Sequence, residues 1–132
     1  MLISLTLGKY MKAHPMNSDI NAECVPASMI RVVATRYGLS LKVLGKLIGI
    51  GTSAVYRKQG TLLNSNISTH LLQLDRLMKI AIEYFGCEPN ARAWFFQYNR
   101  GLVSEPIKLC GNWHGINRVE NSLMKLMHGM TS

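Results

Sequence analysis

The stretch LSLKVLGKLIGIGTSAVYRKQG, residues 39–60, decides the fold, because two short helical patterns stand there on either side of a glycine-rich turn. Ser40 can cap the first helix, and the apolar residues that follow it recur at intervals of three and four. Gly49 can end this helix, since glycine adopts the positive φ angle that such a stop requires. A second helix is expected over residues 52–58. The connection between the helices is so short that they must meet at a sharp angle, as in a helix-turn-helix.

A helix-turn-helix of this kind divides its residues between a core side and an outer side. The residues expected on the core side are Leu44, Ile48, Ile50 and Val55. The residues expected to project from the second helix toward a DNA major groove are Thr52, Ser53, Tyr56 and Arg57. Lys42 and Lys46 on the first helix would lie near the phosphates of the same DNA.

Helical periodicity continues on both sides of this stretch. Further helices are expected over residues 26–37, 67–85, 89–98, 106–110 and 117–128. The long central helix should stop at Gly86, and the last helix begins with Asn117 and Glu120 at the spacing of a capping box. These patterns predict an all-α fold in which a helix-turn-helix bundle is joined by a long helix to a small helical domain.

The chain of 132 residues is long enough for one compact domain or for two small helical domains. We expect an N-terminal arm over residues 1–24, a helix-turn-helix region over residues 25–66, and a long helix with a C-terminal domain over residues 67–132. The arm lacks steady periodicity, and we expect it to be partly disordered.

The net charge of +8 is concentrated in the middle of the chain. Between Val25 and Leu74 there is no Asp or Glu, and the basic residues there are Arg31, Arg36, Lys42, Lys46, Arg57 and Lys58. The rest of the chain carries nine basic residues against seven acids. A field of one sign attracts a polyanion such as the backbone of DNA. A solvated basic face with no ligand would have the same composition.

Cysteine usage and hydropathy indicate the compartment. Cys24, Cys87 and Cys110 are odd in number and have no CxxC spacing, so neither a disulfide framework nor a zinc site is indicated. This usage fits a reducing environment, and we expect a cytoplasmic protein. The apolar start MLISLTLG has no basic residue before it and makes a poor signal peptide. No apolar run approaches the roughly 20 residues that span a bilayer.

Known catalytic motifs are not evident in this sequence. There is no nucleophile motif and no phosphate-binding glycine loop, and seven acids leave few pairs for acid–base catalysis. Cys110 and His114 are four residues apart, but Gly111 should break the helix between them. A packed cysteine and a loop histidine are therefore favoured over a metal site. We expect a protein that is not an enzyme and that holds no metal or cofactor.

Residues 39–60 resemble the Xre or phage-repressor type of helix-turn-helix, with Gly45 at the small-residue position where helices meet and Gly49 at the turn. In that family the first residues of the recognition helix contact bases. The implied base contacts are Ser53, Tyr56 and Arg57, and the implied phosphate contacts are Lys42, Thr52 and Lys58. An ordinary helical hairpin without a ligand is the alternative, because a fold alone does not establish a function.

Residues 83–129, EYFGCEPNARAWFFQYNRGLVSEPIKLCGNWHGINRVENSLMKLMHG, resemble the C-terminal domain of Xre/ParS/MbcA-type antitoxins. The features that carry this resemblance are Phe85-Gly86, Ala91 with Trp94, Asn99 with Leu102, Pro106, Gly115, Val119, Leu123 and Gly129. The chain departs from the family in one loop, where Val103-Ser104 replaces the usual pair of glycines and the loop is about one residue shorter.

The resemblance implies an antitoxin of a type II toxin–antitoxin system. Its partner would be a toxin of the RES or ParT kind, which attacks NAD or uses it to modify a target, and the antitoxin would block the toxin's active-site cleft. It also implies a homodimer that binds a palindromic operator and represses its own operon. The toxin-binding candidates are Trp113, Arg118, Asn121, Lys125 and His128. For each the alternative is a solvated surface position, or for Trp113 a place in the core.

Two other classes of protein remain open. A free-standing regulator of the phage-repressor type would use its C-terminal half only to dimerise, and it predicts a symmetric apolar surface there and no toxin partner. A small enzyme would require a concave polar site that these residues do not assemble.

Overall fold

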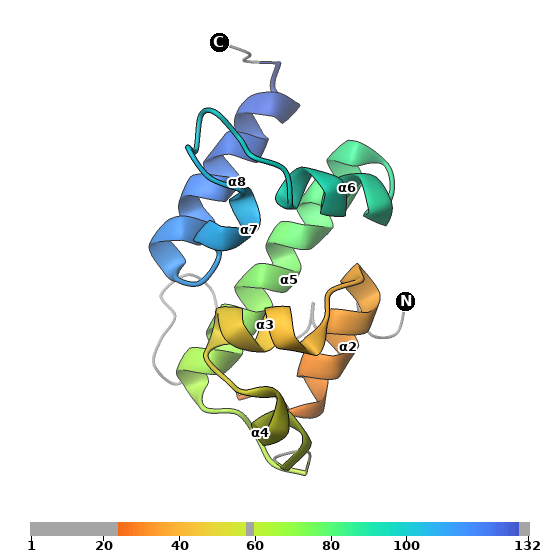
Figure 1. Cartoon of the computed structure of the whole chain (residues 1–132), viewed down its shortest axis with the longest axis vertical. Helices are drawn as coiled ribbons and strands as arrows, with labels where there is room; N and C mark the ends of the chain where they lie inside the picture. The colour runs from red at the N-terminus through yellow and green to blue at the C-terminus, as the bar shows by residue number, and fades with distance from the viewer. Residues whose placement is uncertain (1–23, 58–59, 130–132) are drawn as a thin grey trace. The chain divides into compact units, whose positions relative to one another are not determined.

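The computed structural model describes residues 24–57 and 60–129, and within these ranges the fold is all-α, as predicted. The described residues form no strand, and their only bridges are isolated pairs at Pro26–Leu62 and Asn99–Ser104. The helices are α2 (Ser28–Tyr37), α3 (Leu41–Ile48), α4 (Thr52–Arg57), α5 (Ser65–Phe85), α6 (Glu88–Phe95), α7 (Pro106–Leu109) and α8 (Trp113–Met127) (Figure 1). The expected arm falls outside the described residues, apart from Cys24.

The described chain divides inside α5 into two compact units. The first unit ends at Gln73 and contains α2, α3, α4 and the start of α5. The second begins at Leu74 and contains the rest of α5 together with α6, α7 and α8. The long helix therefore supplies core residues to both units.

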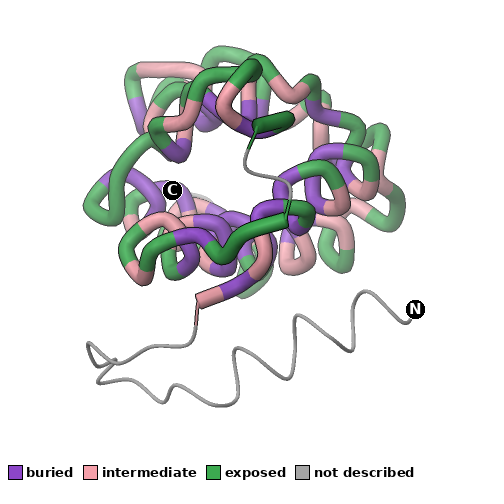
Figure 2. Tube along the Cα trace, turned by 90° about the horizontal axis from the view of Figure 1, so that it is seen from below, coloured by how far each residue is buried: buried purple, intermediate pink, exposed green. Residues whose placement is uncertain are grey.

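The core of the first unit forms where α2 packs against α3. Along α2 the buried residues are Met29, Ile30, Val33, Ala34 and Tyr37. Buried and exposed residues alternate along the described parts of the chain (Figure 2). Gly38 ends α2 with φ 67°; its N–H donates to the carbonyl of Thr35, and the N–H of Leu39 donates to the carbonyl of Ala34. The stop predicted at this glycine is confirmed, because only a residue that tolerates positive φ closes the helix in this way.

Backbone pairing ties the start of α2 to the segment that leads into α5. The N–H of Ala27 donates to the carbonyl of Thr61 at 2.9 Å, and the N–H of Leu63 donates to the carbonyl of Val25 at 2.8 Å. The buried hydroxyl of Ser68 accepts from the N–H of Val25 at 3.0 Å and donates to the carbonyl of Leu63 at 3.3 Å. These hydrogen bonds satisfy the hydroxyl of Ser68 and several backbone groups of the buried connection, as buried polar groups require.

The long helix α5 begins two residues before the predicted start. Asn64 is the cap, since its Oδ1 accepts from the N–H of Ile67 at 2.9 Å. The helix ends where expected, at Gly86, which has φ 90° and donates its N–H to the carbonyl of Ile82 at 2.8 Å. Helical periodicity predicts an apolar stripe along this helix. Its buried members include Leu71, Leu74, Leu77, Met78 and Ala81, while Phe85 at the end of the stripe is half-buried.

Helix α6 is shorter than the predicted 89–98. It ends at Phe95, where the N–H of Phe96 donates to the carbonyl of Arg92 and the N–H of Gln97 donates to the carbonyl of Trp94. Tyr98 was expected on the packed side of this helix, but it lies beyond the helix end and is 61% exposed. Beyond the helix, the side chain and backbone of Asn99 organise the loop that follows.

Helix α8 begins at Trp113 and not at the predicted Asn117. Asn112 is the cap, and its side chain accepts from the N–H of Gly115 at 2.8 Å. Gly115 precedes the predicted helix but lies inside the observed one, and it must be a glycine because a Cβ there would collide with the carbonyl oxygen of Leu109. The glycine is therefore a point of close approach between α7 and α8.

Glu120 joins α8 to α5, so its predicted capping role is wrong. Both of its carboxylate oxygens accept from the guanidinium of Arg76, at 2.6 and 2.9 Å. The hydrogen bond to Glu120 and the attraction between the charges raise the pKa of Arg76 above its ordinary value, against the opposing effect of burial. The pair is bidentate, which is the geometry that gives an arginine–carboxylate contact its orientation.

No helix in the described ranges has both the length and the apolar character needed to cross a membrane.

Candidate functional site

The turn between α3 and α4 is built on two glycines. Gly49 ends α3 with φ 84°, a left-handed conformation that strains other residues. The N–H of Ile50 then donates to the carbonyl of Gly45 at 2.8 Å. A Cβ on Gly45 would collide with the carbonyl oxygen of Ile50, so the turn folds back directly over this position. The small residue predicted at a contact between helices is therefore needed by the backbone of the turn.

Residues of α3 and α4 divide between core and surface largely as the sequence predicts. Ser40 caps α3 through its hydroxyl, which accepts from the N–H of Val43 at 3.0 Å. The expected core residues are Leu44, Ile48 and Val55, which are buried, and Ile50, which is half-buried. The four expected outer residues, Thr52, Ser53, Tyr56 and Arg57, are all exposed. Lys58 lies outside the described residues.

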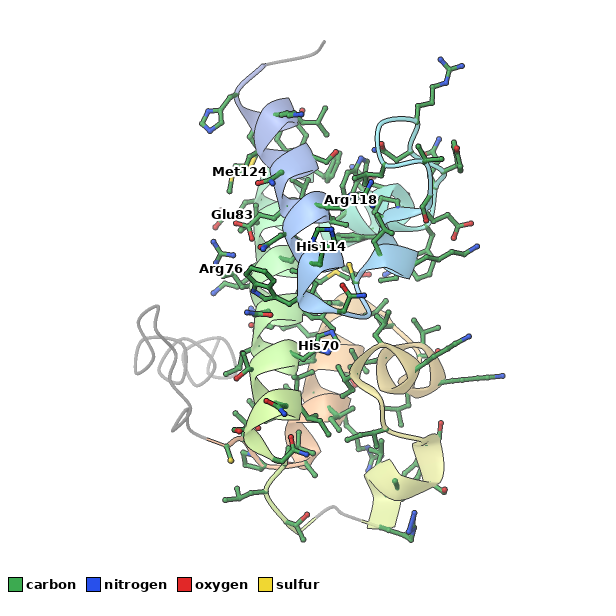
Figure 3. The ribbon with its side chains drawn as sticks, turned by 90° about the vertical axis from the view of Figure 1, so that its left-hand side faces the viewer. His70, Arg76, Glu83, His114, Arg118 and Met124 are labelled. Carbon is green, nitrogen blue, oxygen red and sulfur yellow. The ribbon has the colours of Figure 1, made fainter. Side chains whose placement is uncertain are left out.

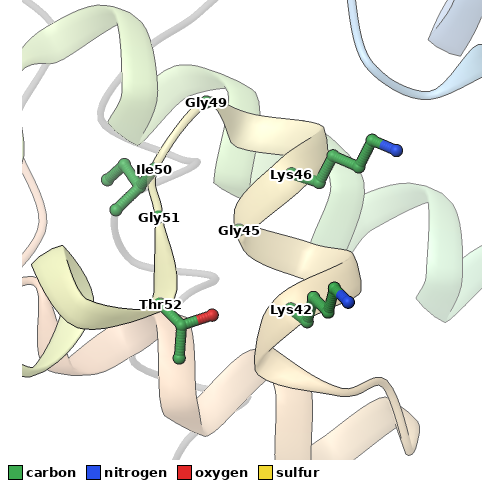
Figure 4. A pocket seen from close by; sticks show the side chains of 7 residues that line it. All are labelled: Lys42, Gly45, Lys46, Gly49, Ile50, Gly51 and Thr52. Atoms are coloured by element: carbon green, nitrogen blue, oxygen red, sulfur yellow. The ribbon is translucent and has the colours of Figure 1, made fainter.

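A shallow hollow of about 350 Å³ lies over this turn. It is lined by Lys42, Gly45, Lys46, Gly49, Ile50, Gly51 and Thr52. Lys42 and Lys46 are exposed and extend from α3 on one side, while Ile50 points the other way (Figure 4). The lining of the hollow is almost wholly apolar, and the side chains of both lysines extend away from the turn.

Arg31 of α2 contacts the exposed face of α4, and the sequence did not indicate this contact. Its guanidinium lies over the ring of Tyr56, with Cζ 5.1 Å from the ring centroid. Tyr56 is 51% exposed, so the pair lies at the surface. Arg31 entered the sequence argument only as one of several positive charges, because no local pattern links it to Tyr56.

The described part of the first unit carries basic residues and no acidic residue. From Val25 to Leu74 there is no acidic residue, and the first acid that follows, Asp75, is buried. The basic residues of the described part are Arg31, Arg36, Lys42, Lys46 and Arg57. With no carboxylate among them, their fields add in the surrounding solvent, and an anionic partner would neutralise them.

A second candidate surface follows α8. Arg118, Asn121, Lys125 and His128 recur at helical spacing and are all exposed, as the sequence predicts. His114 is exposed one turn before Arg118 and extends the same face (Figure 3). The sequence did not predict His114 on this face, because residue 114 was expected to lie in a loop. We call these five residues the outer face of α8.

Trp113 stands beside this face. It occupies the first position of α8 and is 62% exposed, so it is a surface residue. One residue corresponds to about 100° around a helix, which places Trp113 next to the outer face and not within it. A large exposed indole is a typical anchor for a protein partner.

Trp94, in contrast, is part of a half-buried aromatic cluster. Its ring lies 5.8 Å from that of Phe85 and 5.1 Å from that of the buried Phe95. Tyr84 contacts Phe85 edge to face at 4.8 Å and extends the cluster to the surface. These ring contacts give Trp94 a packing role where α5 meets α6.

A scan against models of known protein families finds none that matches this chain, and a search of the curated proteins finds no match. Function is therefore inferred from the two surfaces and from the sequence resemblance.

The two residues weighed for a metal site lie in different environments. Cys110 is buried, and its thiol donates to the carbonyl of Pro106 at 3.4 Å. Burial raises the pKa of Cys110 to about 12, because the thiolate would lose its solvation. His114 is exposed on α8, with Gly111 in the turn between the two helices. Across residues 24–57 and 60–129, no group of three His, Cys, Asp or Glu residues is placed to hold a metal.

Proposed function

We propose that the protein is a DNA-binding antitoxin of a type II toxin–antitoxin pair. Its first unit binds operator DNA as a helix-turn-helix, and its second unit binds and neutralises a toxin of the RES or ParT kind that consumes NAD. The resemblance of the sequence to Xre/ParS/MbcA-type antitoxins motivates this proposal, and the chemistry of the two surfaces supports it.

The observation that carries the DNA-binding half is the combination of geometry and charge around α4. Four polar or aromatic side chains along the short helix α4 are exposed, and the surrounding sequence has no acid between Val25 and Leu74. Such a helix can enter a major groove. The excess of basic residues between Val25 and Leu74 supplies an affinity for phosphates that does not depend on the DNA sequence.

The roles of individual residues follow from their chemistry. Ser53, Tyr56 and Arg57 read base edges, and Arg57 can bond guanine through two parallel hydrogen bonds. Lys42 and Thr52, at the rim of the hollow over the turn, hold phosphates. The chain acts as a homodimer, whose two-fold symmetry matches a palindromic operator.

The outer face of α8 supports the toxin-binding half. Its five residues are exposed and polar, and none of them is an acid. The buried side of the same helix, with Ile116, Val119 and Leu123, is used for the core. A rigid helix that presents basic residues can cover the cleft of a partner, so neutralisation is steric.

A free-standing phage-type regulator is the second candidate. It requires an apolar C-terminal surface on which two copies dimerise. The outer face of α8 is polar. The exposed apolar residues of the second unit, which include Trp113 and Met127 of the same helix, are spread over several elements. This distribution favours the antitoxin.

Co-expression of the chain with the protein encoded beside its gene tests the proposal. Truncation is unsuitable, because deleting residues 117–132 removes the buried Val119 and Leu123 and would unfold the second unit. The test variant is instead the exposed double substitution Asn121→Ala/Lys125→Ala, with Arg57→Ala as the matched surface control. Co-purification with the neighbour, and restored toxicity in the α8 variant alone, are expected. A neighbour that neither binds nor is toxic would favour the free-standing regulator.

A further inference from the structure

The loop over residues 98–104 has a fixed backbone. Asn99 holds it from within: its Oδ1 accepts from the N–H of Leu102 at 3.0 Å, and its carbonyl accepts from the N–H of Val103 at 2.8 Å. The N–H of Asn99 donates in turn to the carbonyl of Ser104 at 3.0 Å. From α8, the guanidinium of Arg118 donates to the carbonyl of Leu102 at 3.3 Å. The loop is thus closed on itself and attached to the outer face of α8.

Val103 adopts a conformation that its side chain disfavours. Its φ is 57°, and it is the only non-glycine residue with positive φ in the described ranges. Such an angle is an outlier for a β-branched residue, whereas glycine and asparagine adopt it readily. Packing does not repay the strain, because the side chain is 70% exposed. Strain retained at an exposed position points to a role outside the folded chain.

The side chains that this loop presents are those of a protein-binding surface. Tyr98 and Arg100 are exposed together with Val103, and these are an aromatic, an arginine and an aliphatic residue. Tyrosine and arginine dominate the binding energy of protein interfaces, and rigid presentation lowers the entropic cost of binding.

Charge specifies the kind of partner. The 98–104 loop and the outer face of α8 contain no Asp or Glu. Arg100 and Lys125 form no ion pair with any described residue. Their charges are therefore available to carboxylates on another molecule, and complementary charges would orient that molecule on this surface.

We propose that the 98–104 loop docks into an apolar recess with an acidic rim on a partner protein, with Val103 as the anchor and Arg100 at the rim. The inference rests on the proposed function, since the partner it names is the toxin. It goes further by assigning a contact outside α8 and by stating the chemistry of the surface that receives it.

Two substitutions at Val103 test the proposal, because each should stabilise the free protein and weaken its binding to the partner. Val103→Gly and Val103→Asn both relieve the strained φ, so the melting temperature of the free protein should rise. Both also remove the apolar anchor, so the Kd for the purified neighbour-encoded protein should increase by about tenfold or more. Asparagine favours the left-handed conformation without the added backbone freedom of glycine. If both variants bind equally weakly, the loss of the valine side chain and not a more flexible loop is the cause. The exposed Gln97→Ala, just before the loop, serves as the control that changes neither quantity.

A merely structural role for Val103 would raise the melting temperature and leave the Kd unchanged, and this result would overturn the inference. The charge reversal Arg100→Glu should weaken toxin binding by more than tenfold and leave operator binding intact. Loss of operator binding instead would place the loop on the DNA-binding surface and overturn the proposal. If the wild-type chain binds and neutralises the neighbour while all loop variants do so equally, the proposed function stands and the loop assignment fails. If the wild type does not bind the neighbour, both fail.

Discussion

The guanidinium of Arg31 lies over the ring of Tyr56, 5.1 Å from its centroid, and joins α2 to the exposed face of α4. A cation–π contact at an exposed site contributes about 0.5–1 kcal/mol. Because Tyr56 is proposed to contact bases, the main effect of the pair is to restrict the directions in which the ring can point.

Substitution of Arg31 should therefore change both the affinity and the selectivity of DNA binding. Arg31→Met removes charge and stacking, and should weaken operator binding by about 1 kcal/mol. Arg31→Lys keeps the charge but stacks less well, so it should retain the salt dependence of binding and lose part of the discrimination against unrelated DNA. Titrations at several salt concentrations measure both properties. If Arg31→Lys discriminates operator from unrelated DNA as well as the wild type does, Arg31 acts only through its charge.

Gly45 and Gly51 form a matched pair for testing the turn. A Cβ at Gly45 would collide with the backbone oxygen of Ile50, while a Cβ at Gly51 would meet nothing within 4 Å. Gly45→Ala should lower the free energy of unfolding by about 1–3 kcal/mol, the range for overpacking. Gly51→Ala should be neutral. Urea denaturation of both variants measures the difference, and similar stability for the two would contradict the described turn.

The pair of Arg76 and Glu120 should couple α5 to α8 in the second unit. Their bidentate contact is partly exposed, with 46% and 17% of the side-chain surface accessible, so solvent screens it. A double-mutant cycle of Arg76→Met and Glu120→Gln should give a coupling free energy of about 1 kcal/mol. Additive effects of the two substitutions would mean that the contact does not persist in solution.

Cys110 should be chemically inert while the protein is folded. Its thiol is buried, whereas Cys87 is exposed at the start of α6, so a thiol reagent should modify Cys87 at least about tenfold faster. Cys110 should react only at the rate of unfolding, which mass spectrometry of the labelled protein can follow. Rapid labelling of both cysteines would show that Cys110 is not packed in the core.

The raised pKa of Cys110 also sets a pH dependence. Its contribution to stability is fully present below the ordinary thiol pKa of about 8.5 and is lost as the pH rises toward about 12, because the unfolded chain then binds fewer protons than the folded one. Between these limits the wild type should lose stability relative to Cys110→Ala. If the stability of the two proteins declined in parallel as the pH rises, the raised pKa of Cys110 would be contradicted.

Local signals in the sequence were sufficient for the elements that glycine and a capping residue define. Gly38, Gly49 and Gly86 end their helices with positive φ, and Ser40 caps α3 through its hydroxyl, as predicted. Each of these features depends only on residues within one turn of the helix, so the sequence alone contains the necessary information.

The errors arose where tertiary contacts override local patterns. Asn117 and Glu120 have the spacing of a capping box, but Glu120 binds Arg76, 44 residues away, and Asn112 caps the helix. Gly115 resembled a loop residue because its reason lies in the backbone of α7. Arg31 and Tyr56 come from separate helices in the same way, so no local pattern could bring them together.

The central claim is that DNA binding and toxin neutralisation reside on separate surfaces of one chain. Its most direct test measures both activities in Arg57→Ala and in Lys125→Ala, two exposed basic residues on α4 and α8. Arg57→Ala should weaken binding to the DNA upstream of the gene by about 1–3 kcal/mol and still neutralise the neighbouring toxin. Lys125→Ala should bind this DNA as the wild type does and neutralise less well. Equal loss of both activities in either folded variant would contradict the division of function between the two units.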